Sequence, residues 1–253
     1  MDIDVLELSD RNARFILSGV TPAFANAIRR SILAEVPVMA IDDVNIYDNT
    51  SVLFDEMLVL RLAMIPIKTD LESYVLPSEC TCAGVGCPRC QLSMKLSAEG
   101  PKMVYSKDLV SADPKVGPVD DNIPIVELKG KQKLIIEAIA RLGLGRDHSK
   151  WQAGVACGYK NMPKIVVTNC DACGSCVTEC PKGILKLSGN KVTVTDELSC
   201  TACSLCEEAC EIHGIEIRDV PDSFVFTFET SGSLSAKELV LKAIDSIESR
   251  ADS

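Results

Sequence analysis

The chain has 253 residues, and 47% of them are apolar, which excludes a disordered chain. Its formal net charge is -10, with 36 acidic against 26 basic residues, so a surface that grips nucleic-acid phosphates over a wide area is not expected. The acidic start "MDIDVLELSD" and the lack of any apolar run near the ~18 residues that span a bilayer predict a cytoplasmic protein without a signal peptide or membrane span.

The N-terminal region predicts two short strands followed by a helix. Residues 2–8 and 14–17 suit strands, and "TPAFANAIRRSILAEVP" then changes to helical spacing. Thr21 is a suitable N-cap, Pro22 falls at the first helical position, and Pro37 ends the helix. Apolar residues recur three and four positions apart, at Phe24, Ala27, Ile28 and Ile32. On pattern alone, this stripe favours an ordinary core helix.

Residues 42–162 form a first predicted insert, which we expect to be mainly β, although periodicity alone does not establish the order of its elements. Its loop "CTCAGVGCPRC" combines a CxC with a CxxC spacing, at Cys80, Cys82, Cys87 and Cys90. Four thiolates this close in sequence can surround one tetrahedral ion, and Zn(II) is the usual occupant of a closed all-sulfur site. Free thiols and a disulfide are the alternatives.

Residues 163–220 form a second predicted insert and contain an internal duplication. The spacing CxxCxxCxxxC occurs twice, thirty residues apart, at Cys170, Cys173, Cys176 and Cys180 and again at Cys200, Cys203, Cys206 and Cys210. Three thiolates two residues apart can hold one face of a [4Fe-4S] cluster, while the fourth points toward a second site. The predicted ligands are therefore crossed. Cluster 1 takes Cys170, Cys173, Cys176 and Cys210, and cluster 2 takes Cys200, Cys203, Cys206 and Cys180.

This duplication resembles the two-cluster bacterial ferredoxin domain over about fifty-five residues. Pro181 matches the proline that follows the fourth cysteine in that family, whereas Glu211 replaces it in the second motif. Disulfides are the less favoured interpretation, because cytoplasmic cysteines are normally kept reduced. Since so short a segment buries little apolar surface, cluster binding should supply much of its folding free energy.

The C-terminal region mirrors the N-terminal one. "SFVFTFET" alternates as a strand does, and "LSAKELVLKAIDSIESR" is an amphipathic helix with a capping box at Ser235 and Glu238. Its apolar stripe comprises Leu239, Val240, Ala243, Ile244 and Ile247. We therefore predict an α+β protein in which residues 1–41 and 221–253 form one discontinuous dimerisation domain, with a mainly β domain and a ferredoxin-like domain inserted into it.

Four segments in chain order resemble the D-type subunit family of archaeal RNA polymerase, the counterpart of the bacterial α subunit and of the eukaryotic third-largest subunit. "TPAFANAIRRSILAEVPVMAID" carries the family's Asn-Ala-aliphatic-Arg-Arg core, and "FDEMLVLRLAMIPIKTD" has Leu60 and Ala63 where the family has histidine and glycine. "GLGRDHSKWQAGVACGY" matches a Gly-x-Gly-x-x-His-x-Lys-Trp loop that includes His148, Lys150 and Trp151. "FVFTFETSGSLSAKELVLKAI" resembles the closing strand and helix.

The resemblance implies a heterodimer with the small archaeal subunit L, which then nucleates assembly with subunits N and P and the large catalytic subunits. The first and last helices would pack against the equivalent helices of L through Phe24, Ile28, Ile32, Leu239, Ala243 and Ile247. Some members carry a ferredoxin-like insert with one or two cluster motifs, and eukaryotic counterparts often carry a zinc loop where residues 80–90 lie.

We therefore predict a non-catalytic assembly subunit that holds two [4Fe-4S] clusters and one Zn(II). No nucleophile, phosphate-loop or zinc-protease motif occurs in the sequence, so no catalytic residue is expected in this chain. Direct sequence-specific binding of nucleic acid is not expected either, because of the acidic balance. The alternative is a ferredoxin-type electron-transfer subunit of a redox complex, although no flavin or nicotinamide motif accompanies the cysteines.

Overall fold

The computed structural model describes residues 1–252, which form two compact units. Of the described residues, the first unit comprises 1–6, 14–25 and 158–227, and the second comprises 7–13, 26–157 and 228–252. Helices accompany several separate antiparallel sheets, which confirms the predicted α+β class. No helix within residues 1–252 is long and apolar enough to cross a membrane.

One four-stranded sheet draws its strands from both ends of the chain. Its order is β1 (Asp2–Leu8), β2 (Asn12–Ser18), β12 (Ile215–Thr230) and β9 (Gly154–Val167). Aromatic side chains hold its first-unit part together, because the Phe15 and Phe226 rings stack with centroids 5.1 Å apart and Tyr159 stacks on Phe226 at the same distance. The edge strand β1 is exposed along its whole length.

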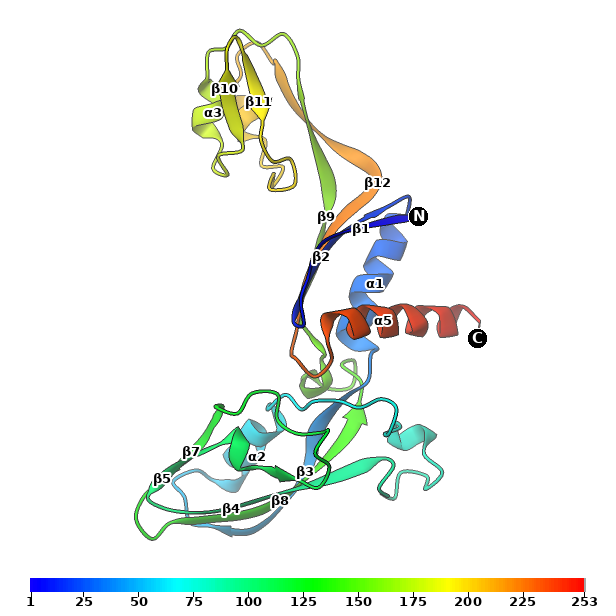
Figure 1. Cartoon of the computed structure of the whole chain (residues 1–253), viewed down its shortest axis with the longest axis vertical. Helices are drawn as coiled ribbons and strands as arrows, with labels where there is room; N and C mark the ends of the chain where they lie inside the picture. Colours follow the sequence, from blue (N-terminus) through cyan, green and yellow to red (C-terminus); the bar gives the residue numbers. More distant parts are fainter. Residues whose placement is uncertain (253) are drawn as a thin grey trace. The chain divides into compact units, whose positions relative to one another are not determined.

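The ferredoxin-like region lies within the first unit, between β9 and β12 (Figure 1). It consists of a short helix α3 (Ser175–Glu179), the hairpin β10 (Leu185–Ser188) and β11 (Lys191–Val194), and a second short helix α4 (Leu205–Glu208). The two helices begin thirty residues apart, as the duplicated motif predicts. Each follows a residue with positive φ, namely Gly174 at 81° and Ser204 at 61°.

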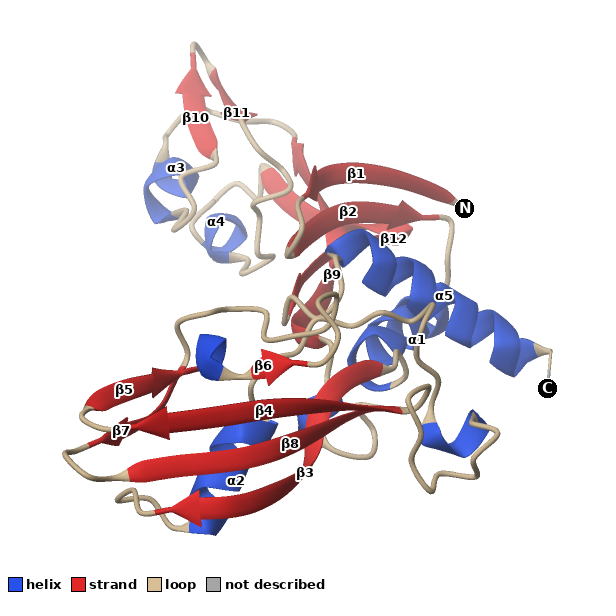
Figure 2. Ribbon diagram, turned by 60° about the horizontal axis from the view of Figure 1, so that its bottom comes forward, coloured by secondary structure: helices blue, strands red, loops and turns tan. Residues whose placement is uncertain are grey.

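The second unit contains a four-stranded antiparallel sheet built from residues 38–143 (Figure 2). Its order is β3 (Val38–Asn49), β8 (Lys133–Gly143), β4 (Gln91–Glu99) and β6 (Val110–Ser111), and β5 (Lys102–Tyr105) pairs separately with β7 (Pro124–Leu128). Strand β8 is the run "KLIIEAIARLG", whose alternate side chains are buried: Leu134, Ile136, Ala138, Ala140 and Leu142. Because every second side chain is buried, this run is a strand, whereas its apolar residues alone do not distinguish a strand from a helix.

Helix α2 (Asp55–Ala63) contacts β3 and β7 and buries Leu58 and Leu62 in the core of this part. The core extends over residues 39–142, whereas a separate buried cluster occupies residues 165–217. Each predicted insert thus has its own apolar cluster. The predicted boundaries at residues 41, 162 and 220 stay predictions.

Helices α1 (Pro22–Ala34) and α5 (Ala236–Ala251) have the predicted caps. The Thr21 hydroxyl accepts the Phe24 N–H at 3.3 Å, and Ser235 and Glu238 form the capping box of α5. In the second unit, the C-terminal half of α1 packs against α5, where Ser31 Oγ donates to the carbonyl of Ala243 at 2.8 Å. This contact buries one polar side chain with its hydrogen bond satisfied.

Candidate metal sites and partner surface

The four cysteines of the 80–90 loop lie within reach of a single metal ion. Their Sγ atoms all lie within 4.8 Å of one another. The Sγ–Sγ distances are 3.4 Å for Cys80–Cys82, 3.5 Å for Cys80–Cys87 and Cys82–Cys90, and 3.9 Å for Cys87–Cys90. Four sulfurs at about 2.3 Å from a tetrahedral zinc ion lie about 3.8 Å apart. The sulfur atoms therefore have the spacing of an all-cysteine zinc site.

The backbone of the loop favours this arrangement. Cys87 donates its N–H to Cys90 Sγ at 3.3 Å, while the Cys90 N–H returns to the Cys87 carbonyl at 2.9 Å. Gly86 has a φ of 110°, and a Cβ atom there would lie 2.4 Å from Oε1 of Gln91. Only glycine suits this turn without strain, so the loop brings its two cysteine pairs together through a residue that has no side chain.

The thiols of this loop ionise unequally. Burial raises the pKa of Cys90 to about 12, whereas the backbone N–H of Gly86 lowers the pKa of Cys82 to about 6. Metal binding requires thiolates and releases the remaining thiol protons, so a divalent cation would stabilise all four sulfurs in the charged form. Both the sulfur geometry and the ligand chemistry fit Zn(II).

Two cavities in the ferredoxin-like region collect the other eight clustered cysteines. Cavity 1 is lined by Cys170, Cys173, Cys176 and Cys210. Cavity 2 is lined by Cys180, Cys200, Cys203 and Cys206. Each cavity takes three cysteines from one motif and the fourth from the other motif. The structure thus brings together the two crossed sets that the spacing predicts.

The surroundings of these cysteines fit thiolate ligands. The N–H of Gly214 points to Cys210 Sγ at 3.1 Å, and the N–H of Ala202 points to Cys200 Sγ at 3.4 Å. Burial raises the pKa of Cys206 to about 11 and also raises the pKa of Cys176. Apolar pockets that disfavour a free thiolate but offer it N–H donors suit sulfur bound to iron.

The six residues predicted to contact a partner differ in their exposure. Phe24 and Ile247 are half-buried, and the others are buried within this chain: Ile28, Ile32, Leu239 and Ala243. The large apolar side chains that α5 leaves exposed are Leu241 and Ile244, with 51% and 37% of their surface accessible. Sequence periodicity finds the apolar stripe of a helix but does not separate residues that pack inside the chain from those that face outward.

Sequence reasoning also missed an exposed apolar stripe on and beside α2. Its members are between 50% and 78% exposed: Val52, Phe54, Met57, Leu60 and Met64. The opposite side of the same helix buries Leu58 and Leu62. The helix therefore has one apolar stripe in the core and a second one on the surface, and the sequence itself carries both stripes.

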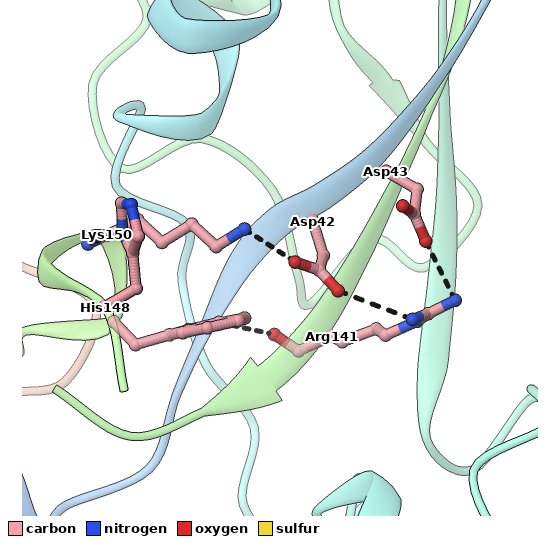
Figure 3. A network of polar contacts seen from close by, with 6 residues as sticks. Asp42, Asp43, Arg141, His148 and Lys150 are labelled. Carbon is pink, nitrogen blue, oxygen red and sulfur yellow. Dashed lines mark hydrogen bonds and ion pairs between the residues drawn. The ribbon is translucent and has the colours of Figure 1, made fainter. Parts of the chain in front are cut away.

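A network of charged side chains holds the Gly-x-Gly-x-x-His-x-Lys-Trp loop, residues 143–151, in place (Figure 3). Lys150 Nζ lies 2.6 Å from Asp42, and Arg141 contacts Asp42 at 3.4 Å and Asp43 at 3.0 Å. The indole N–H of Trp151 donates to the carbonyl of Arg141 at 3.2 Å. The Lys150 side chain is nine-tenths buried, and its Nζ lies 4.3 Å from the centre of the Trp151 ring. The network attaches the loop to β3 and β8.

The glycines of this loop allow close packing. A Cβ atom at Gly143 would lie 2.3 Å from the Trp151 ring, and one at Gly145 would lie 2.2 Å from the carbonyl oxygen of Leu33 in α1. Arg146 donates its N–H to the carbonyl of Ala34, the last residue of α1. The motif therefore positions the end of α1.

Comparison with known proteins gives a consistent result. The family model described as the RNA polymerase Rpb3/Rpb11 dimerisation domain matches residues 14–251. The DNA-directed RNA polymerase subunit Rpo3 of Methanosarcina acetivorans is 57% identical, over 100% of this chain and 96% of the relative. The same subunit of Archaeoglobus fulgidus is 46% identical, over 99% of this chain and 95% of the relative. That of Halobacterium salinarum is 40% identical, over 99% of this chain and 94% of the relative.

Proposed function

The chain belongs to the RNA polymerase Rpb3/Rpb11 dimerisation family, and we propose on that basis that it is the non-catalytic assembly subunit of an archaeal DNA-dependent RNA polymerase. The full-length similarity to Rpo3 subunits carries this conclusion. It gives no support to the alternative of an electron-transfer subunit. The chain forms a heterodimer with a partner subunit of the polymerase, and we assign its place to the cytoplasm.

The partner is subunit L in this proposal, and the heterodimer then recruits subunits N and P and the large catalytic subunits. Obligate interfaces are largely apolar. Exposed Leu241 and Ile244 and half-buried Ile247 on α5 offer such a surface, and half-buried Phe24 on α1 is a further candidate. The four buried residues of the predicted interface support the partner surface only indirectly, because they hold α1 and α5 in place.

The exposed stripe of α2 is suited to a later assembly contact. Five large apolar side chains in the segment 52–64 are at least half exposed, and such a patch is costly to leave in water. We assign this stripe to contact with another subunit of the polymerase, because its exposed apolar side chains are suited to an interface and it lies in the segment "FDEMLVLRLAMIPIKTD", which resembles a segment of the family.

The metal sites have a structural role in this proposal. Each ferredoxin-like cavity uses cysteines from both motifs, so a [4Fe-4S] cluster bound there would cross-link the two halves of the duplication. The loop of Cys80, Cys82, Cys87 and Cys90 would hold one Zn(II). The chain's own contribution is to place the sulfurs, supply N–H donors and cover the sites with apolar side chains.

A matched pair of variants tests the partner surface. Leu241→Glu places a charge on α5, and Leu187→Glu places the same charge on a leucine of equal exposure, 50%, in the ferredoxin-like region. After co-expression with subunit L, size-exclusion chromatography should show that Leu241→Glu weakens the heterodimer at least tenfold and that Leu187→Glu leaves it intact. An unchanged heterodimer with Leu241→Glu would remove α5 from the interface.

A further inference from the structure

The thirty-residue repeat allows the two cavities to be compared position by position. Asp171 lines cavity 1, and its repeat equivalent Thr201 lines cavity 2. Ile212 lines cavity 1, and its equivalent Lys182 lines cavity 2. The first exchange removes a negative charge from cavity 2, and the second adds a positive one. Both exchanges therefore make cavity 2 more positive than cavity 1.

A second cation reaches cavity 2 from β9, outside the repeat. Lys160 Nζ donates to the carbonyl of Cys200 at 2.5 Å and to the carbonyl of Leu198 at 2.6 Å. Arg14 donates to the same Leu198 carbonyl at 3.4 Å. Because Cys200 lines cavity 2, the Lys160 ammonium lies against a ligand residue of that site.

Acidic side chains near the two cavities offset the positive charge of Lys160 and Lys182 only in part. Beside cavity 2, Glu197 accepts the N–H of Ile165 at 3.1 Å and Glu207 accepts the N–H of Ile217 at 2.5 Å. The Asp196 carboxylate accepts hydrogen bonds from the hydroxyl and the N–H of Ser199. Backbone and hydroxyl donors thus offset part of each of these negative charges.

Acidic groups are present at cavity 1 as well. Asp171 accepts the N–H of Cys173 at 3.1 Å, and Glu211 directly follows the cavity-1 residue Cys210. Carboxylates therefore lie near both cavities, whereas Lys160 and Lys182 are associated with cavity 2. The two lysines, together with the exchange of Asp171 for Thr201, make the charge difference between the sites.

We propose that Lys160 and Lys182 make the two cluster sites electrostatically unequal, so that a one-electron donor reduces the site in cavity 2 before the site in cavity 1. The donor would lose one electron, and a cluster held in cavity 2 would become more negative by one unit. No bond to the protein forms or breaks, and no proton is required. Nearby cations stabilise the more negative, reduced form and raise its reduction potential. The inference rests on the proposed occupancy of both cavities and assigns no electron-transfer role to the chain.

The test is a redox titration of the full chain, purified anaerobically with subunit L and reduced with dithionite, followed by electron paramagnetic resonance. The wild type should show two reduction waves. Lys182→Gln should make reduction of the higher-potential site about tenfold less favourable, a shift of about 59 mV for one electron, and should leave the lower wave in place. Asp171→Asn should instead raise only the lower wave.

Two further variants complete the design. Lys160→Gln should shift the same wave as Lys182→Gln, because Lys160 donates to the carbonyl of the cavity-2 residue Cys200. Lys186→Gln removes an exposed lysine that neither lines a cavity nor donates to a cavity cysteine, and it should shift neither wave. The proposal is overturned if the two cavity-2 variants leave both waves unchanged, or if Asp171→Asn moves the higher wave. Iron and sulfide analysis distinguishes these outcomes from failure of the premise, because a chain without about eight iron atoms lacks the two clusters themselves.

Discussion

The two cysteine-rich regions differ in what holds their backbone in place. The 80–90 loop belongs to a part of the chain with a large apolar core, which includes Leu58, Met94, Leu96 and Ile136. In the ferredoxin-like region, four of the nine residues described in the buried cluster are cysteines that line the cavities: Cys176, Cys200, Cys206 and Cys210. In the proposed sites, metal would therefore be an addition to a packed domain in the first region and a component of the core in the second.

The same ligand chemistry would therefore have two different thermodynamic roles in this chain. Where ligands make up much of the core, the free energy of metal binding becomes free energy of folding. Where a separate core exists, metal loss relaxes a loop and leaves the sheet behind it intact. Variants that remove ligands or core residues from either region test this difference.

Removal of the clusters should have the largest effect. Cys206→Ser removes a buried ligand of cavity 2, and we expect residues 163–220 to lose most of their ordered structure, because few apolar residues remain to replace the lost ligation. Hydrogen exchange should rise throughout α3, β10, β11 and α4, while strands β3, β4 and β8 stay protected. Retained protection of the hairpin β10–β11 without iron would show that the region folds on apolar packing alone.

A core substitution in the other region should have the next largest effect. Ile136 on β8 is 2% exposed and packs in the apolar core, so Ile136→Ala should lower the free energy of unfolding of this part by about 2–5 kcal/mol. Denaturant unfolding of the heterodimer measures the change. Ile135→Ala, at a neighbouring position that is 37% exposed, is the matched control and should cost much less. Equal losses from both substitutions would contradict the assigned face of β8.

Sequence reasoning accounts for much of this comparison, because cysteine spacing and helix caps are local signals. The offset of thirty residues is sufficient to predict the crossed sets that line the two cavities, and the Ser235 capping box is found where predicted. The run 133–143 is different, since apolar residues of β8 are equally compatible with a buried helix until the partner strands β3 and β4 are known.

The partner surface shows a second limit of the sequence. Ile28 and Ile32 lie in the apolar stripe of α1 and are buried by parts of the chain that are distant in sequence. A Cβ atom at Gly154 on β9 would lie 3.0 Å from Ile32, and the neighbouring Ser31 donates to the carbonyl of Ala243 on α5, two hundred residues away. The ion pairs of Asp42 with Lys150 and Arg141 are equally non-local. Non-local contacts of this kind leave no periodic signal, so the roles of these residues become visible only in three dimensions.

Loss of the zinc ligands should have a smaller effect than the core substitution. Cys87→Ser removes a partly exposed ligand of the 80–90 loop and should abolish zinc binding, but the core around Ile136 does not include this side chain. The free energy of unfolding should therefore fall by less than with Ile136→Ala. Metal analysis together with denaturant unfolding checks both statements. A loss as large as that of Ile136→Ala would make the zinc loop as essential to its domain as the clusters are to theirs.

The smallest effect is expected where a glycine in a metal-binding segment has open space around it. Gly183 has a φ of 61° and no neighbouring atom within 4 Å of an added Cβ, so Gly183→Ala should cost only the left-handed strain, about 1 kcal/mol. Gly86→Ala should cost more, because its Cβ would also displace Gln91. Thermal melting of the metal-loaded heterodimer compares the two, and Gly183→Asn should be better tolerated than Gly183→Ala, since asparagine adopts positive φ more readily. A greater loss at Gly183 than at Gly86 would mean that cluster binding constrains its turn more tightly than the open surroundings of Gly183 indicate.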